Sequence, residues 1–190
     1  MQIDRILYPV TALGPGERLV IWTIGCSKHC YKCANPELWA RNPDKNLDAG
    51  ELVHLITQAV DTQKIDGITI TGGDPLEQIA ELAVLLPLLR EITDDVLIYT
   101  GYTAAEAEAA LSPSEWEALR QFTDVLIDGP YINDLNDGKC VLRGSANQNI
   151  IFFDERKKNK YTEYMEKGRT VQNVFYNNKM ISVGIHNRDL

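Results

Sequence analysis

The sequence predicts an α/β fold in which a mostly parallel sheet curls into a partial barrel. Short apolar segments alternate along the chain with helix-start signals, the order expected of βα units. The first apolar segment, Leu19–Ile24, is nearly continuous, which is typical of a strand covered on both faces of a parallel sheet. Near the end of the chain, two strand-like runs flank Asn177-Asn178 and predict a β-hairpin.

Local signals predict the remaining core elements. Each expected helix opens with a capping side chain and a glutamate three residues later, a pair that satisfies the free amides of a helix start. Apolar runs at 68–71, 96–99 and 125–127 are expected to be strands. Pro87 is expected to kink or end the helix that follows Pro75. The capping pairs are Asp48 with Glu51, Asp74 with Glu77, Thr103 with Glu106, and Ser112 with Glu115.

The tail of the chain differs from the βα pattern before it. We expect residues 1–148 to form the core domain and residues 149–190 to form an extension packed on or beside it. An apolar run at 150–153 opens this extension. The hairpin is expected at 171–176 and 180–185, because asparagine tolerates the positive φ angles that a tight hairpin turn requires.

Composition excludes several classes of protein. A chain of 190 residues that is 44% hydrophobic is expected to form one globular domain with a substantial core. Its net charge of -8 disfavours nucleic-acid binding. No apolar run approaches the roughly 20 residues that span a bilayer, so we expect no membrane association. The first residues lack the apolar core of a signal peptide, and the expected location is the cytoplasm, where thiols stay reduced.

Three cysteines follow the first strand closely. Cys26, Cys30 and Cys33 have C-x3-C-x2-C spacing. Such a loop can hold three corners of a 4Fe-4S cluster and leave the fourth iron without a protein ligand. The same cysteines with His29 could instead make a structural zinc site, and a disulfide is a weaker alternative. Cys140 is left without a role.

The second candidate motif is Gly72-Gly73-Asp74-Pro75, a loop between an expected strand and helix. Its glycines allow a ligand to approach the backbone, and the Asp74 carboxylate could accept hydrogen bonds from a ligand ammonium group. A purely structural interpretation is also open. In that case the glycines make the turn, Asp74 caps the helix and Pro75 is the first helical residue.

Weaker candidates lie at the ends of the next two strands. Thr100 and Asp128 could bind ribose hydroxyls or a ligand amine, although both segments also serve as ordinary turns. In α/β folds these strand ends meet at one face, where sites form. His54 and His186 are isolated in the sequence, and we interpret both as structural.

Together the motifs resemble the radical S-adenosylmethionine (SAM) superfamily, and within it the glycyl-radical enzyme activases that act on anaerobic ribonucleoside-triphosphate reductase. Lys32 departs from the pattern, because an aromatic residue usually precedes the third cysteine. The tail from about residue 149 is a second departure. The matching motifs span residues 8 to 148 and are Tyr8-Pro9, Gly14-Pro15-Gly16 with Arg18, the three cysteines with Ala34-Asn35 and Trp39, Gly72 to Leu76, Thr100-Gly101-Tyr102, Asp128-Gly129, and Arg143-Gly144-Ser145 with Asn147-Gln148.

The resemblance implies a partial (β/α) barrel of the radical SAM type and a set of roles. Cys26, Cys30 and Cys33 would bind the 4Fe-4S cluster, and SAM would bind the open iron. Further contacts to SAM would come from the Gly72, Gly73 and Asp74 loop at its ammonium group, from Lys32, Cys33 and Ala34 near the nucleoside, and from Thr100 and Asp128. No catalytic side chain is expected beyond the cluster and the SAM site.

The resemblance also implies a reaction and partners. Reductive cleavage of SAM would give a 5′-deoxyadenosyl radical, which would generate a glycyl radical on anaerobic ribonucleoside-triphosphate reductase. Flavodoxin or ferredoxin would supply the electron. One alternative is a small radical SAM enzyme that acts on another protein or peptide. A less favoured one is a zinc-stabilised binding module.

Overall fold

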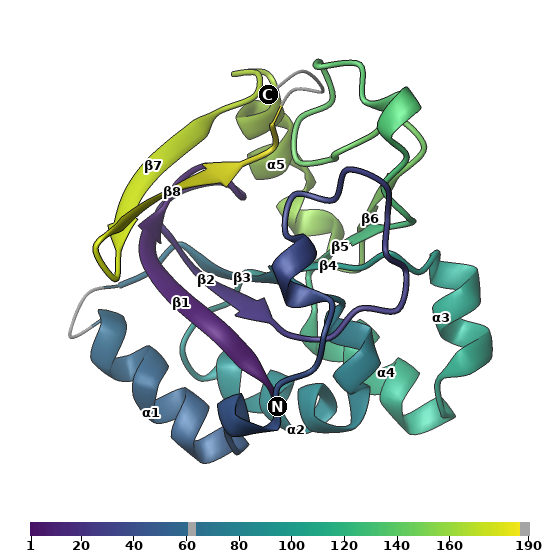
Figure 1. Cartoon of the computed structure of the whole chain (residues 1–190). Helices are drawn as coiled ribbons and strands as arrows, with labels where there is room; N and C mark the ends of the chain where they lie inside the picture. Colours follow the sequence, from purple (N-terminus) through teal and green to yellow (C-terminus); the bar gives the residue numbers. More distant parts are fainter. Residues whose placement is uncertain (61–63, 187–190) are drawn as a thin grey trace.

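A six-stranded sheet forms the centre of the computed structural model, which describes residues 1–60 and 64–186 (Figure 1). Its strands lie side by side in sequence order, and β2 to β5 run parallel with one antiparallel strand at each edge. This confirms a mixed α/β fold with a sheet rich in parallel pairs. The strands are β1 (Ile3–Val10), β2 (Arg18–Thr23), β3 (Gly67–Gly72), β4 (Val96–Tyr99), β5 (Val125–Asp128) and β6 (Asn149–Phe152).

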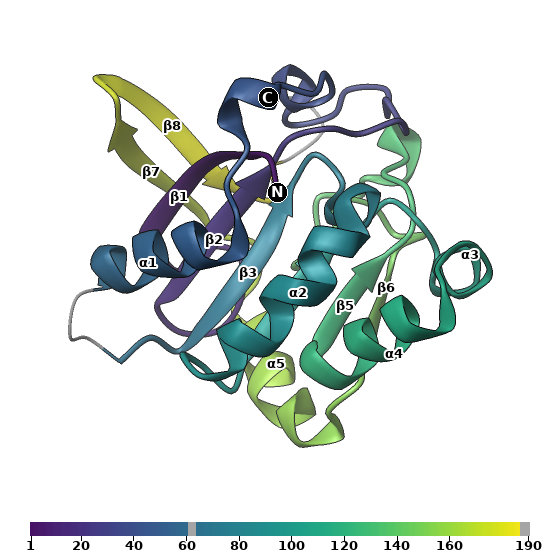
Figure 2. The same cartoon turned by 90° about the horizontal axis from the view of Figure 1, so that it is seen from below.

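Helices connect the parallel strands. Figure 2 shows α1, α2 and α4 across one face of the sheet. Among the described residues, no helix has both the length and the apolar character needed to cross a bilayer. The α-helices are α1 (Ala49–Val60), α2 (Ile79–Arg90), α3 (Ala104–Ala110), α4 (Pro113–Phe122) and α5 (Lys158–Met165); the short 3-10 helices are η1 (Pro36–Leu38), η2 (Pro43–Lys45), η3 (Pro75–Gln78), η4 (Asn133–Leu135) and η5 (Glu155–Lys157).

The predicted C-terminal hairpin is confirmed. β7 (Val171–Tyr176) pairs antiparallel with β8 (Lys179–Gly184), and their turn places Asn177 at φ 48° and Asn178 at φ 59°. Two positive φ angles match a tight hairpin turn, which explains the two asparagines. In Figure 1 the hairpin lies on the side of the sheet opposite α1 and α2.

Both faces of β2 are covered, as its continuous apolar sequence predicts. Leu19 and Ile21 join the core beneath the helices. Val20 and Trp22 point to the other face and pack in a cluster with Val183 of the hairpin. Successive strand residues face opposite sides of a sheet, so a strand buried on both sides needs apolar residues throughout.

The expected helix caps form at three of the four sites. Reciprocal hydrogen bonds join Asp48 to Glu51, Thr103 to Glu106 and Ser112 to Glu115. The fourth pair does not close in this way. The carboxylate of Asp74 accepts the amide of Leu76 at the start of η3, while the carboxylate of Glu77 accepts the amide of Ser27.

Pro87 does not end its helix, so of the two expected outcomes, a kink or an end, the end is wrong. The α2 helix continues through Pro87 to Arg90. Leu86 and Leu89 on either side of the proline are fully buried. Their burial outweighs the backbone hydrogen bond that proline removes.

A buried ion pair joins the amino ends of the central strands. Arg18 is fully buried, and its guanidinium lies 3.1 Å from the Asp95 carboxylate and donates to Thr69 Oγ1 at 2.7 Å. Tyr161 Oη and Lys160 Nζ of α5 also donate to Asp95, each at 2.7 Å. Burial alone would raise the pKa of Asp95, but Arg18 and the two α5 donors outweigh burial and hold the pKa below its usual value. Asp95 is therefore a buried carboxylate stabilised by its partners.

Replacing Asp95 with alanine should strongly destabilise the fold, because the charge of Arg18 would remain buried without its partner. We expect a loss of about 3–5 kcal/mol in the free energy of unfolding. The matched control is Asp94→Ala, since the neighbouring Asp94 is 93% exposed and pairs with Lys157 at the surface. That variant should lose at most about 1 kcal/mol. Urea denaturation at pH 7 measures both values, and equal losses would contradict this view of the pair.

Candidate functional site

A cavity of about 650 Å³ opens at the carboxyl ends of the parallel strands. This volume lies within the roughly 300–1,000 Å³ range of small-molecule and cofactor sites. Its wall comes from four strand-end segments and from the C-terminal segment. The lining includes Cys26, Cys30, Cys33, Gly72, Gly73, Asp74, Thr100, Gly101, Gly129 and His186.

A backbone hydrogen bond closes the cysteine loop, and two residues with positive φ angles set its course. The amide of Cys26 donates to the carbonyl of Trp39 at 3.0 Å, which ties the start of the loop to its end. His29 has φ 44° and Lys32 has φ 55°, left-handed values that are uncommon outside glycine. These turns bring all three thiols onto the wall of one cavity.

The three loop thiols suit a cluster better than a single ion. Cys26, Cys30 and Cys33 are free, half-buried thiols. Burial raises the pKa of Cys26 and of Cys30. Within residues 1–60 and 64–186, no three His, Cys, Asp or Glu side chains lie close enough together to hold one metal ion. A 4Fe-4S cluster does not require such convergence, because each thiolate binds a different iron.

His29 takes a role outside the thiol group. Its ring lies 4.7 Å from the ring of Trp39, centroid to centroid. The backbone at His29 makes the turn, and its side chain covers the residue that closes the loop. The structure therefore uses His29 as a packing residue rather than as the fourth ligand of a zinc site.

Asp74 connects the ends of β3 and β4 through its buried carboxylate. Its side chain accepts hydrogen bonds from Thr100 Oγ1 at 2.9 Å, the Gly101 amide at 2.8 Å and the Leu76 amide at 3.1 Å. Only 1% of Asp74 is exposed. Burial raises the pKa of Asp74 to about 6, against the opposing effect of the hydrogen bonds from Gly101 and Thr100. Asp74 thus fixes the loops that form this side of the cavity.

The two glycines before Asp74 allow neighbouring strands to approach closely. A Cβ on Gly73 would lie 2.4 Å from the carbonyl oxygen of Gly25, and one on Gly72 would lie 2.5 Å from the amide nitrogen of Thr23. Gly72 also has φ 110°, a conformation that side chains rarely adopt. The glycine pair therefore sets the end of β3 directly against the base of the cysteine loop.

Two residues of the cavity wall carry a buried polar atom that has no hydrogen-bond partner among the described residues. They are Trp39, at Nε1, and Tyr99, at Oη. Three free thiols and glycine-lined backbone on one cavity fit a 4Fe-4S cluster together with a polar organic ligand.

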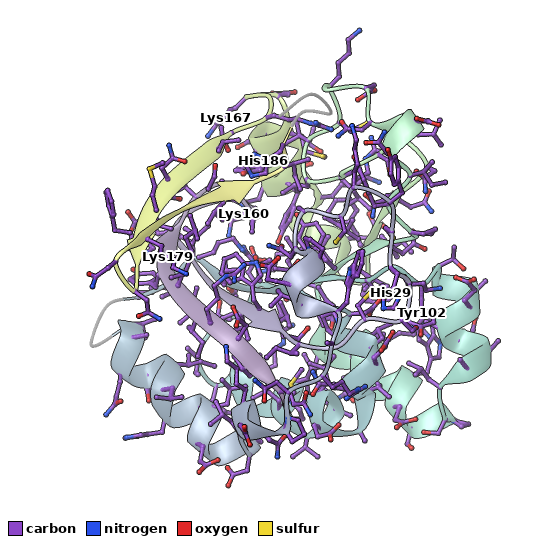
Figure 3. All side chains as sticks on the ribbon, viewed as in Figure 1. His29, Tyr102, Lys160, Lys167, Lys179 and His186 are labelled. Carbon is purple, nitrogen blue, oxygen red and sulfur yellow. The ribbon has the colours of Figure 1, made fainter. Side chains whose placement is uncertain are left out.

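Sequence reasoning missed Lys28, which covers the rim of the site. Its ammonium lies 3.9 Å from the centroid of the Tyr102 ring and 3.8 Å from a Glu106 carboxylate oxygen. Figure 3 labels Tyr102 and His29 on the side of the molecule that carries α3. A lysine between two cysteines gives no local sequence signal for such a contact, because Tyr102 is distant in the chain.

The structure brings the predicted site residues to this cavity with one exception, and it adds Lys28 and His186 to the lining. Lys32, Ala34 and Thr100 line it together with the cysteines and the Gly72 to Asp74 loop. Asp128 does not line the cavity. Its buried carboxylate accepts the amide of Ala104 at 2.7 Å and the side chain of Asn149 at 2.8 Å, which gives it a structural role. His186, interpreted from the sequence as structural, lies in the cavity wall.

Removing the hydroxyl of Thr100 should destabilise the site, because Thr100 donates to the buried Asp74 carboxylate. We expect Thr100→Val to lower the free energy of unfolding by about 1–3 kcal/mol. Thr123→Val is the matched control, since Thr123 is also buried but its Oγ1 has no hydrogen-bond partner among the described residues. That change should be neutral or stabilising. Urea denaturation distinguishes the two variants, and a Thr100→Val protein as stable as wild type would refute the assigned bond.

Comparison with known proteins identifies the family. The family described as a 4Fe-4S single cluster domain matches residues 12–151. The anaerobic ribonucleoside-triphosphate reductase-activating protein of Pasteurella multocida (strain Pm70) is 35% identical over 155 residues, covering 78% of this chain and 96% of that protein. The protein of the same name from Escherichia coli (strain K12) is 31% identical, covering 74% of this chain and 92% of that protein. The one from Enterobacteria phage T4 is 34% identical, covering 79% of this chain and 93% of that protein. The resemblance inferred from the motifs is confirmed. The chain belongs to the family of anaerobic ribonucleoside-triphosphate reductase-activating proteins and contains a 4Fe-4S single cluster domain.

Proposed function

We propose that this protein is a radical SAM enzyme that generates a glycyl radical on anaerobic ribonucleoside-triphosphate reductase. The observation that carries the proposal is the placement of three free thiols and the Gly72 to Asp74 loop on one cavity. The names of the relatives, which cover most of the chain, support the reductase as the partner. When bound, a reduced 4Fe-4S cluster supplies the electron that cleaves SAM to methionine and a 5′-deoxyadenosyl radical, which removes a hydrogen atom from a glycine of the reductase.

The residues of the chain bind and orient in this proposal. Cys26, Cys30 and Cys33 would hold three irons and leave the fourth open to SAM. The glycines before Asp74 place polar backbone at the cavity, where it can hold the methionine ammonium group. The Asp74 carboxylate already accepts protein donors, so its larger contribution would be to fix this loop.

The other face of the cavity would receive the nucleoside. Lys32, Cys33 and Ala34 line it beside Thr100. The backbone amides and carbonyls of this segment can hydrogen-bond a ribose or base atom. In place of Asp128, the adjoining Gly129 lines the cavity and would leave room for the ligand.

The proposal also covers the type of fold, the domain boundary, the electron donor and the location in the cell. We propose that the sheet is a partial barrel of the radical SAM type, which the in-order strands and the packing of α1, α2 and α4 on one face support. Residues 1–148 would be its core and residues 149–190 an extension, of which 187–190 lie outside the described residues. Flavodoxin or ferredoxin would donate the electron. Free clustered thiols favour the cytoplasm.

Anaerobically reconstituted protein should release 5′-deoxyadenosine from SAM in the presence of dithionite and form a glycyl radical on the host reductase. Cys30→Ser should reduce release to background, because it removes one cluster ligand. Cys140→Ser is the matched control, since Cys140 is a free thiol that does not line the cavity. Chromatography measures the nucleoside, and electron paramagnetic resonance measures the radical.

Two results would contradict the proposal in different ways. Release by wild type that produces no radical on the reductase would keep the SAM chemistry and point to another protein or peptide substrate. An iron-loaded wild type that releases nothing, or a Cys30→Ser variant as active as wild type, would exclude the assigned site.

A further inference from the structure

The segment after α5 builds one end of the cavity. Gly184, Ile185 and His186 line the same cavity as the cysteine loop. The family match ends at residue 151, so this part of the wall lies outside the matched domain. Figure 3 places His186 near the end of β8, away from Tyr102 and His29. This end of the site is therefore contributed by the extension and not by the conventional cofactor motifs.

The hairpin is anchored over the sheet by polar and apolar contacts. The side-chain amide of Gln172 accepts the Thr11 amide at 2.9 Å and donates to the Pro9 carbonyl at 3.0 Å. Val183 is buried in the cluster that contains Trp22. These contacts hold β7 and β8 against the ends of β1 and β2, so the segment that leads to His186 has a fixed course.

Arg169 joins this segment to the loop that forms the neighbouring wall. Its guanidinium donates to the carbonyl of His186 at 3.0 Å, the carbonyl of Cys140 at 2.7 Å and Asn136 Oδ1 at 2.9 Å. The third guanidinium nitrogen donates to the Arg143 carbonyl at 3.3 Å. One rigid fork of donors thus connects two cavity walls that are far apart in the chain.

The hydrogen bonds continue from Arg169 into the loop that follows β5. Asn136 donates to Tyr131 Oη at 3.2 Å, and Tyr131 Oη donates to Asn133 Oδ1 at 3.2 Å. Tyr131, Asn133 and Asn136 all line the cavity, so Arg169 helps to fix this part of its wall.

The chemistry of this end of the cavity suits a peptide. Charged side chains that line the cavity belong to the cysteine loop and to Asp74. The far wall presents a phenol, amides, an aliphatic side chain and an imidazole, from Tyr131, Asn133, Asn136, Ile185 and His186. Tyr131, Asn133 and Asn136 bond one another, and His186 Nε2 lies 3.3 Å from the Ser182 carbonyl oxygen. Each of these side chains retains a further donor or acceptor position, which can pair with peptide backbone without requiring a charged substrate group.

We propose that residues 169–186 form a specificity wall for the glycine-bearing peptide segment of the partner, with Arg169 as its positioning residue and His186 as a contact to the peptide. This inference rests on the proposed function, because it names how the same site recognises its protein substrate. Arg169 acts through the residues it holds, whereas His186 lies on the cavity itself.

Titration of the host reductase with cluster-loaded protein under anaerobic conditions tests the wall. We expect Arg169→Gln to raise the Kd for the reductase about tenfold or more, a loss of roughly 1.4 kcal/mol. The half-saturating reductase concentration for glycyl-radical formation should rise in parallel, with the maximal rate little changed. Arg169→Lys should recover part of the affinity. Lys167→Gln removes a nearby exposed positive charge and should behave as wild type.

A second variant keeps the test decisive if Arg169→Gln fails to fold. His186→Ala changes only a side chain on the wall and should also weaken reductase binding. Wild-type Kd values for His186→Ala and for folded Arg169→Gln would overturn the wall while leaving the proposed function intact. A fall in maximal rate at unchanged Kd would also overturn it. If the wild-type protein forms no glycyl radical on the reductase, the proposed function is contradicted, and the specificity wall that rests on it is contradicted too.

Discussion

The carboxylate of Asp74 is the interaction on which the site depends. It is almost fully buried, and it holds the ends of β3 and β4 together through Thr100, Gly101 and its own η3 cap. The backbone of the same residue donates to Gly25 at 2.7 Å, immediately before the first cysteine. Three strand-end loops therefore meet at one residue. Loss of that carboxylate would separate the cofactor-binding loops without touching a cysteine.

A second buried carboxylate secures the opposite ends of the strands. Asp95 pairs with Arg18, and the long arginine side chain needs space that glycines provide, because a Cβ on Gly67 would lie 2.2 Å from its guanidinium. Lys160 and Tyr161 of the extension complete this group. The C-terminal part of the chain thus contacts the amino ends of the strands through α5 and reaches the cavity at their carboxyl ends through His186. These two attachments support its assignment to the substrate wall.

Local patterns predicted most of the fold and singled out the motifs that line the cavity. Continuous apolar runs located β2 to β5 within one residue, and Asn177-Asn178 located the hairpin, because these signals act between near neighbours. Long-range contacts were not predictable in this way. Arg169 and the carbonyl of His186 are joined by a hydrogen bond across the chain, and Asp128 accepts hydrogen bonds from Ala104 and Asn149, and none of these contacts has a local sequence signal. Pro87 was misjudged because burial of its neighbours outweighed its local cost.

The electron paramagnetic resonance spectrum of the reconstituted, dithionite-reduced protein, recorded before and after SAM is added, tests the central claim most directly. With three cysteine ligands and one open iron, the protein should give the signal of a reduced 4Fe-4S cluster, and SAM should change that signal by binding the open iron. A cluster signal that SAM leaves unchanged would contradict the account. So would a protein that binds zinc in place of iron at Cys26, Cys30 and Cys33.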